Sequence, residues 1–177
     1  ISLALILGSS LPQWHVIGDA HWEYNVADLV ISSGYWDTTF VFKGNAMLSI
    51  VILRPVYSII TGLGLTDTFK FVSPFLFALV PLGLFRFSTI YLSPERSFLA
   101  SCYLMFFWSF FIKLPNSYRT QAAMLFLVLL LPGLLGDNKS HRKDRRLWPL
   151  FAVGLILSHY TTAYLFFFLL VSAVGSS

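Results

Sequence analysis

The chain has 177 residues, of which 56% are hydrophobic and only 11% are charged, and its formal net charge is +4. A soluble domain of this size needs more polar residues to cover its surface, so the composition argues against one and predicts an all-α, multi-pass transmembrane protein. The single cysteine, Cys102, excludes an intramolecular disulfide framework.

The chain begins with an apolar run over residues 1–11. Crossing a hydrocarbon core of about 30 Å takes roughly 20 residues, so this run is too short to be a complete span. No basic region precedes it, which argues against the core of a signal peptide. We expect it to be the end of a first span, and the chain to be an N-terminal fragment of a longer membrane protein.

Residues 12–67 are more polar and should form a loop outside the membrane. The segment carries five acidic and two basic residues, a net charge of −3 (Asp19, Glu23, Asp28, Asp37 and Asp67 against Lys43 and Arg54). Helical periodicity over residues 21–33 places Trp22, Val26, Leu29 and Val30 on one face, and Ser32-Ser33-Gly34 is typical of a helix end.

A second helix is expected over residues 45–62, with a kink at Pro55. Arg54 makes a full crossing costly, so we expect this helix and the one before it to lie at the membrane interface. A spanning helix at 45–62 is the alternative.

Four membrane spans should follow, at residues 68–87, 97–114, 118–135 and 148–174. Pro74 and Pro81 should kink the first of them. The run Ser93-Pro94-Glu95 is typical of a helix start, with a capping serine, a proline in the first turn and an acid near the helix N-terminus.

The loop at 137–147 holds five basic and two acidic residues, a net charge of +3. The positive-inside rule places it in the cytoplasm, so residues 12–67 and the start of the 118–135 span should lie outside. Contact with anionic lipid headgroups accounts for its charge. A nucleic-acid partner is not expected, because no aromatic residues are interleaved with these charges.

Asp19 and Glu23 are the main candidates for chemistry. They are four residues apart, so on a helix they share a face with roughly 5–6 Å between their Cβ atoms. Such a pair could bind Mg²⁺ or Mn²⁺, or supply a general base sheltered by aromatic neighbours. The structural alternative is a helix cap at Asp19 with Glu23 compensating the helix dipole. A zinc site at His15 and His21 is not favoured, because their spacing matches no zinc motif.

Two further residues could serve a site. Arg119 opens a span on the same side as the acidic pair, where it could bind phosphate or simply extend its charge to the membrane surface. His159 lies near the middle of the 148–174 segment, and an ionisable residue within the membrane suggests function. A neutral packing histidine, bonded to Ser158, Thr161 or Thr162, is the alternative.

An outside loop with an acidic pair, interfacial helices and further spans resembles the GT-C superfamily of membrane glycosyltransferases. More closely, the chain resembles an uncharacterised, largely archaeal family of predicted multi-pass membrane proteins. The motifs that carry this resemblance, in order, are His21-Trp-Glu23-Tyr24, Gly34-Tyr-Trp36-Asp37, Asn45-Ala-Met-Leu-Ser-Ile, Pro55-Val-Tyr57-Ser, Phe69-Lys70, Pro81-Leu-Gly-Leu and Ser158-His159-Tyr160.

The resemblance implies transfer of a sugar from a polyprenyl-phosphate donor to an acceptor at the outer face. Asp19 or Glu23 would deprotonate the acceptor hydroxyl or hold the divalent metal, Mg²⁺ or Mn²⁺. Arg119 and His159 would face the lipid phosphate. The motif positions add three substrate-binding candidates (Tyr160, Trp36 and Asp37).

The resemblance also implies an integral protein of the plasma membrane of an archaeon or another prokaryote. Two other functions stay open from the residues. A transporter or flippase would use Asp19, Glu23 and His159 as ion or proton sites, but acids deep within spans are not seen. A non-enzymatic membrane subunit would use the acids only as helix caps.

Overall fold

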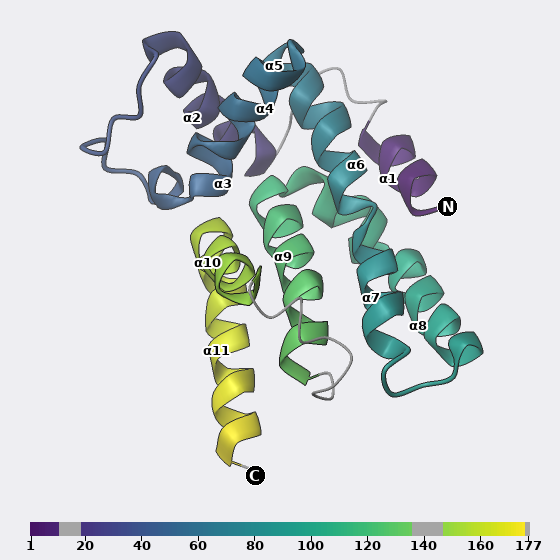
Figure 1. Ribbon diagram of the computed structural model, residues 1–177. Helices are drawn as coiled ribbons and strands as arrows, with labels where there is room; N and C mark the ends of the chain where they lie inside the picture. Colours follow the sequence, from purple (N-terminus) through teal and green to yellow (C-terminus); the bar gives the residue numbers. More distant parts are fainter. Residues whose placement is uncertain (11–18, 136–146, 176–177) are drawn as a thin grey trace.

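The structure is a computed structural model that describes residues 1–10, 19–135 and 147–175 (Figure 1). Every regular element among these residues is a helix, which confirms the all-α prediction. The expectations for His15 and for the basic loop fall outside the described residues, apart from Leu147 at the end of that loop.

The first two helices are α1 (Ser2–Ser10) and α2 (Asp19–Ser33). Helix α2 ends at Gly34, whose φ of 75° is the left-handed conformation that glycine adopts most readily, so the predicted helix end is confirmed. Val26 is buried as expected, whereas Leu29 is 54% exposed. The buried face also includes Glu23, which an apolar periodicity could not reveal.

The predicted helix at 45–62 is divided into η1 (Lys43–Ala46), α3 (Leu48–Val51) and α4 (Leu53–Thr61). In a continuous helix the Pro55 ring would clash with the carbonyl of Val51, four residues earlier. The break falls at Ile52, directly after Val51. The predicted kink is therefore confirmed. Whether these helices lie at an interface stays a prediction.

The next elements form one helical rod over Leu65–Ser88, made of α5 (Leu65–Asp67), η2 (Thr68–Val72), α6 (Ser73–Phe77) and α7 (Val80–Ser88). Its 24 residues are long and apolar enough to cross a membrane, in agreement with the span predicted at 68–87. A π-helical turn precedes Pro74 and a two-residue turn precedes Pro81, so each proline disturbs the regular helix locally.

The predicted span at 97–114 is not one straight helix. Helix α8 (Pro94–Phe106) begins after Ser93 as predicted, but the chain then bends by 54° into η3 (Ser109–Lys113) and η4 (Leu114–Asn116). The bend turns Phe110 into the core, where its ring stacks on Phe77 with centroids 4.8 Å apart. If this bent pair counts as one span, the described residues contain two candidate spans.

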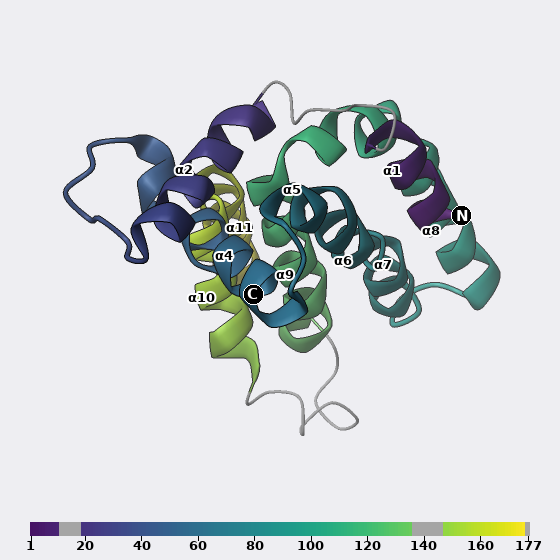
Figure 2. The same cartoon turned by 90° about the horizontal axis from the view of Figure 1, so that it is seen from above.

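Helix α9 (Tyr118–Leu135) matches its predicted bounds, but the segment expected at 148–174 is two helices, α10 (Trp148–Ser158) and α11 (Tyr160–Gly175). His159 separates them with an extended backbone. Figure 1 views α10 nearly along its axis and α11 from the side, and Figure 2 reverses the two views, so the helices run in clearly different directions. The expectation of a single span there is corrected.

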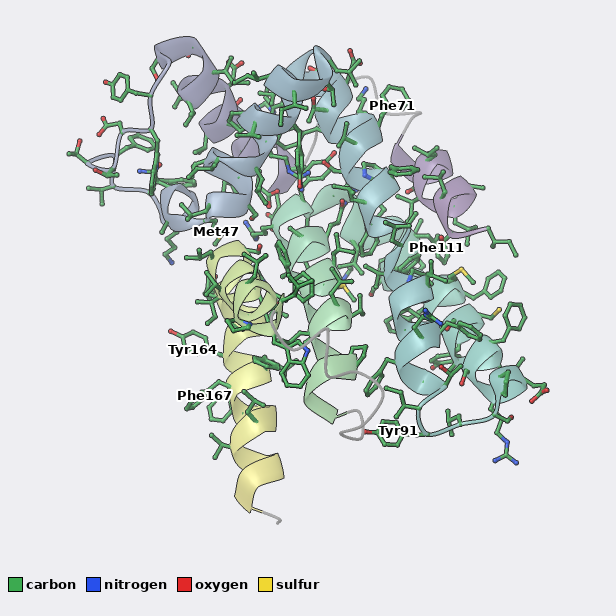
Figure 3. All side chains as sticks on the ribbon, viewed as in Figure 1. Met47, Phe71, Tyr91, Phe111, Tyr164 and Phe167 are labelled. Carbon is green, nitrogen blue, oxygen red and sulfur yellow. The ribbon has the colours of Figure 1, made fainter. Side chains whose placement is uncertain are left out.

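Three apolar clusters hold these helices together. One joins α2 and α3 to Phe69 and Tyr118, one joins α1, α6, α7 and η3 to α9, and one joins α9 to α10 and α11. Helix α11 keeps an outer face that no described helix covers. Figure 3 shows Tyr164 and Phe167 pointing away from α9, and their side chains are 65% and 59% exposed.

Candidate functional site

The candidate site forms where the beginning of α2 reaches the upper end of α9 (Figure 1). Asp19 and Glu23 come from α2 and Arg119 from α9, about one hundred residues further along the chain. Span counting placed Arg119 on the same side as the two acids, and the structure brings all three side chains into contact. We call these three residues the charged cluster.

Arg119 is the centre of the charged cluster. Its Nη2 lies 2.9 Å from Asp19 Oδ2, and its Nη1 lies 3.3 Å from Glu23 Oε1. The guanidinium carbon also lies 4.6 Å from the centre of the Trp22 ring, a favourable cation–π distance. One arginine is therefore held by two carboxylates and an aromatic face, all from the first turns of α2.

Glu23 is fully buried and its side chain caps α9 rather than its own helix. Its Oε2 accepts hydrogen bonds from the backbone N–H groups of Tyr118, at 3.0 Å, and Arg119, at 3.4 Å. The first N–H groups of a helix have no partner within the helix and favour a negative charge nearby. The structural alternative assigned the helix cap to Asp19 and dipole compensation to Glu23. In the structure Glu23 is the residue that caps, and the helix that it caps is α9.

Burial raises the pKa of Glu23 to about 7, against the opposing effects of the Arg119 and Arg54 charges and of the two backbone N–H donors. Glu23 Oε1 makes no hydrogen bond within the described structure, which leaves part of the lost hydration unreplaced. The protonated form of Glu23 is therefore accessible near neutral pH.

Asp19 has the opposite environment. Its side chain is 64% exposed, and Arg119 is its ion-pair partner. An incoming molecule can reach Asp19 directly but cannot reach Glu23. The two acids predicted to share a helix face are therefore divided into one accessible and one buried carboxylate.

Arg54 is a functional candidate that the sequence analysis treated only as an obstacle to spanning. It is 3% exposed, and its guanidinium lies 5.5–5.8 Å from three ring centres (Tyr57, Phe69 and Tyr118). It donates hydrogen bonds to Ser73 Oγ and, at 3.2 Å, to the carbonyl of Tyr118. An isolated arginine within an apolar run was the signal that could have identified it.

Tyr118 connects Arg54 to the charged cluster, because its N–H bonds Glu23 while its carbonyl bonds Arg54. Arg54 and Glu23 also interact electrostatically. Acidic and basic groups thus alternate from Asp19 at the surface to Arg54 in the interior. Beside Arg54 lies a small cavity of about 30 Å³, which Gln121 also lines.

His159 lies at the turn between α10 and α11. Its Nδ1 is 2.8 Å from Thr162 Oγ1, and it interacts electrostatically with Arg119. The neighbouring carbonyl of Ser158 accepts a bond of 3.3 Å from Ser49. Tyr160, the next residue, is 52% exposed. The structure thus brings His159 toward the cluster without direct contact, and Tyr160 faces outward.

Trp36 and Asp37 lie apart from the charged cluster, in the loop between α2 and η1. Trp36 Nε1 donates a 2.8 Å bond to Asn45 Oδ1, and the residue lines an open hollow of about 860 Å³ together with Leu157. Asp37 Oδ1 accepts bonds from the side chain and the backbone N–H of Thr39, which lower the pKa of Asp37. Asp37 has a local role in shaping this loop.

The charged cluster does not suit a divalent cation as it stands. Arg119 lies between the two carboxylates and contacts both, so its positive charge occupies the position that a shared cation would need. Within the described ranges, no group of three or more potential ligands (His, Cys, Asp or Glu) comes together. The Mg²⁺ or Mn²⁺ site stays a prediction that this arrangement does not favour.

Comparison of the chain with protein-family models, with curated proteins and with solved structures yields no match.

Proposed function

We propose that this protein is a multi-pass membrane glycosyltransferase that moves a sugar from a polyprenyl-phosphate donor to an acceptor at the outer face of the membrane. The observation that carries the proposal is Arg119, which is fixed by the buried Glu23 and presented beside the exposed Asp19. A cation next to an accessible carboxylate matches what this reaction needs, a phosphate-binding group beside a general base.

The chemistry assigns each residue a separate task. The acceptor oxygen forms a bond to the anomeric carbon of the sugar, while the bond from that carbon to the phosphate oxygen breaks. Asp19 accepts the proton of the acceptor hydroxyl, and the departing electron pair stays on the phosphate, whose charge Arg119 stabilises. Glu23 positions Arg119 and takes no part in bond making, because it is fully buried.

The proposed topology puts the charged cluster outside. The rod over Leu65–Ser88 is one crossing, and the bent pair formed by α8 and the following turns is a second. In the proposal α9 and the α10–α11 pair also lie within the membrane, and the basic loop after α9 is cytoplasmic. The donor is a lipid, so it would approach Arg119 from the bilayer. The proposed location is the plasma membrane of a prokaryote.

Sugar release from a radiolabelled polyprenyl-phosphate sugar tests the proposal, with the purified protein in lipid vesicles. Water replaces the unknown acceptor, and a panel of hydroxyl compounds can be added. Asp19→Asn should reduce the rate by about 10²–10⁴-fold, the usual contribution of a general base. Asp28→Asn removes the same charge from an exposed position of α2 and should leave the rate unchanged. Equal rates for wild type and Asp19→Asn would refute the assignment.

A further inference from the structure

Arg119 is held unequally on its two sides. Toward the interior, Nη1 contacts Glu23, which is fully buried, and the guanidinium face covers the Trp22 ring. Toward the surface, the ion-pair partner of Nη2 among the described residues is Asp19, whose side chain is 64% exposed. The inner contacts fix the direction of the guanidinium, and the outer contact is the one that an arriving molecule can reach.

We propose that Asp19 occupies the position of an anionic ligand, and that a phosphate oxygen replaces Asp19 Oδ2 at Arg119 Nη2 when a phosphate compound binds. The site recognises a phosphate monoester or diester, and the guanidinium is the group that changes partner. The exchange of binding partners does not depend on the proposed function. Its consequence does, because the released Asp19 acts as a base only in the proposed reaction.

The exchange is favoured at Asp19 for physical reasons. An exposed ion pair contributes little to stability, since both charges are well hydrated when apart. Breaking the Arg119–Glu23 contact instead would leave a buried carboxylate without its cation, which is far more costly. Phosphate also carries several acceptor oxygens and suits the fork of N–H donors on arginine. The phosphate should therefore displace Asp19 and leave Glu23 in place.

The exchange gives the reaction an order. While Asp19 is paired with Arg119, the guanidinium Nη2 occupies Asp19 Oδ2 at 2.9 Å, so this oxygen is not available to the acceptor hydroxyl. Once the phosphate takes the guanidinium, Asp19 Oδ2 is released and lies free beside the sugar. Asp19 Oδ2 thus becomes available to the acceptor only after the donor has bound.

Equilibrium binding of two probes tests the exchange without any turnover. Inorganic phosphate and farnesyl phosphate are titrated into the purified protein in uncharged detergent with a chelator present, and binding is followed by calorimetry. Removing the competing carboxylate in Asp19→Asn should tighten binding by about five-fold, the upper end of what an exposed ion pair contributes. Arg119→Gln should abolish binding of both probes.

Asp28→Asn is the matched control, because it makes the same charge change on the same helix at an exposed position. If it tightens binding as much as Asp19→Asn, the effect is one of overall charge and the proposal is overturned. Unchanged or weaker binding in Asp19→Asn also overturns it. Tightening for both probes supports exchange with free phosphate as a ligand, and tightening for farnesyl phosphate alone supports exchange with a lipid phosphate.

The two proposals fail separately. Tighter phosphate binding in Asp19→Asn without sugar release by the wild type would leave the exchange standing and remove the glycosyltransferase assignment. Sugar release that depends on Asp19, combined with unchanged phosphate binding in Asp19→Asn, would leave the glycosyltransferase assignment standing and overturn the exchange.

Discussion

Replacing Glu23 by glutamine should make the protein more stable at alkaline pH, although the change removes one partner of a buried ion pair. Glutamine has nearly the same shape, and its carbonyl oxygen can still accept the N–H of Tyr118, the 3.0 Å bond that caps α9. It carries no charge, so it imitates the protonated form of Glu23 at every pH. The comparison therefore isolates the effect of ionising this carboxyl.

The magnitude follows from the pKa of Glu23, which burial raises from 4.5 to about 7. The folded state holds this proton more tightly than the unfolded state, so the stability of the wild type falls as pH rises through this window. At 1.36 kcal/mol per pKa unit, the loss is about 3 kcal/mol once pH exceeds 7. The charges of Arg119 and Arg54 oppose this rise in the pKa of Glu23.

Thermal unfolding in detergent between pH 4 and pH 9 measures this difference. The wild type should lose stability relative to Glu23→Gln between about pH 4.5 and 7, and the two should be nearly equal below this window, because both are then neutral at this position. Asp28→Asn should follow the wild-type curve. An ordinary buried ion pair would give the opposite sign, a loss of about 3–5 kcal/mol in the variant at neutral pH. That result would refute the reasoning.

Three other outcomes are expected around the same cluster. Gly44→Ala should lower the melting temperature and weaken phosphate binding, because the added Cβ would lie 2.2 Å from Trp22 Cζ3 and displace the ring that Arg119 covers. Gly8→Ala is the control and should change neither property, because no atom lies within 4 Å of its added Cβ. Arg54→Gln should reduce the free energy of unfolding by roughly 2–4 kcal/mol in chemical denaturation, since buried partners lose their donor. A high-resolution experimental structure should show one or two waters bridging Arg54 Nε and Gln121 Oε1, which have no partner within the described residues and line a cavity of about 30 Å³.

Helix ends with local chemical signals were predictable from the sequence. Gly34 ends α2, Ser93 precedes α8, and α9 has its expected bounds. Two of the breaks that were not predicted, at Phe107 and His159, contain neither proline nor glycine. Contacts between distant segments accompany both breaks, the stacking of Phe110 on Phe77 at the first and the bond from Ser49 to the Ser158 carbonyl at the second. Periodicity within one segment contains no information about such contacts.

The location of the site was only partly predictable from the sequence. Counting spans placed Arg119 on the same side as Asp19 and Glu23, and the structure brings all three together. The spacing of the two acids on α2 made them look equivalent, since it specifies a shared face and not a depth. Their depth depends on where α9 begins, because the free N–H groups of Tyr118 and Arg119 bond Glu23 in the interior.

This division of the acidic pair explains why one carboxylate alone would serve the proposed reaction less well. A surface arginine paired only with Asp19 would be free to turn, and the ordering of its side chain would then oppose phosphate binding. Glu23 and the Trp22 ring settle that orientation during folding, before any ligand arrives. Because Glu23 is anchored to the start of α9 as well, Arg119 and its backbone are held by the same carboxylate. The buried acid thus prepares the cation, and the exposed acid remains available for exchange and proton transfer.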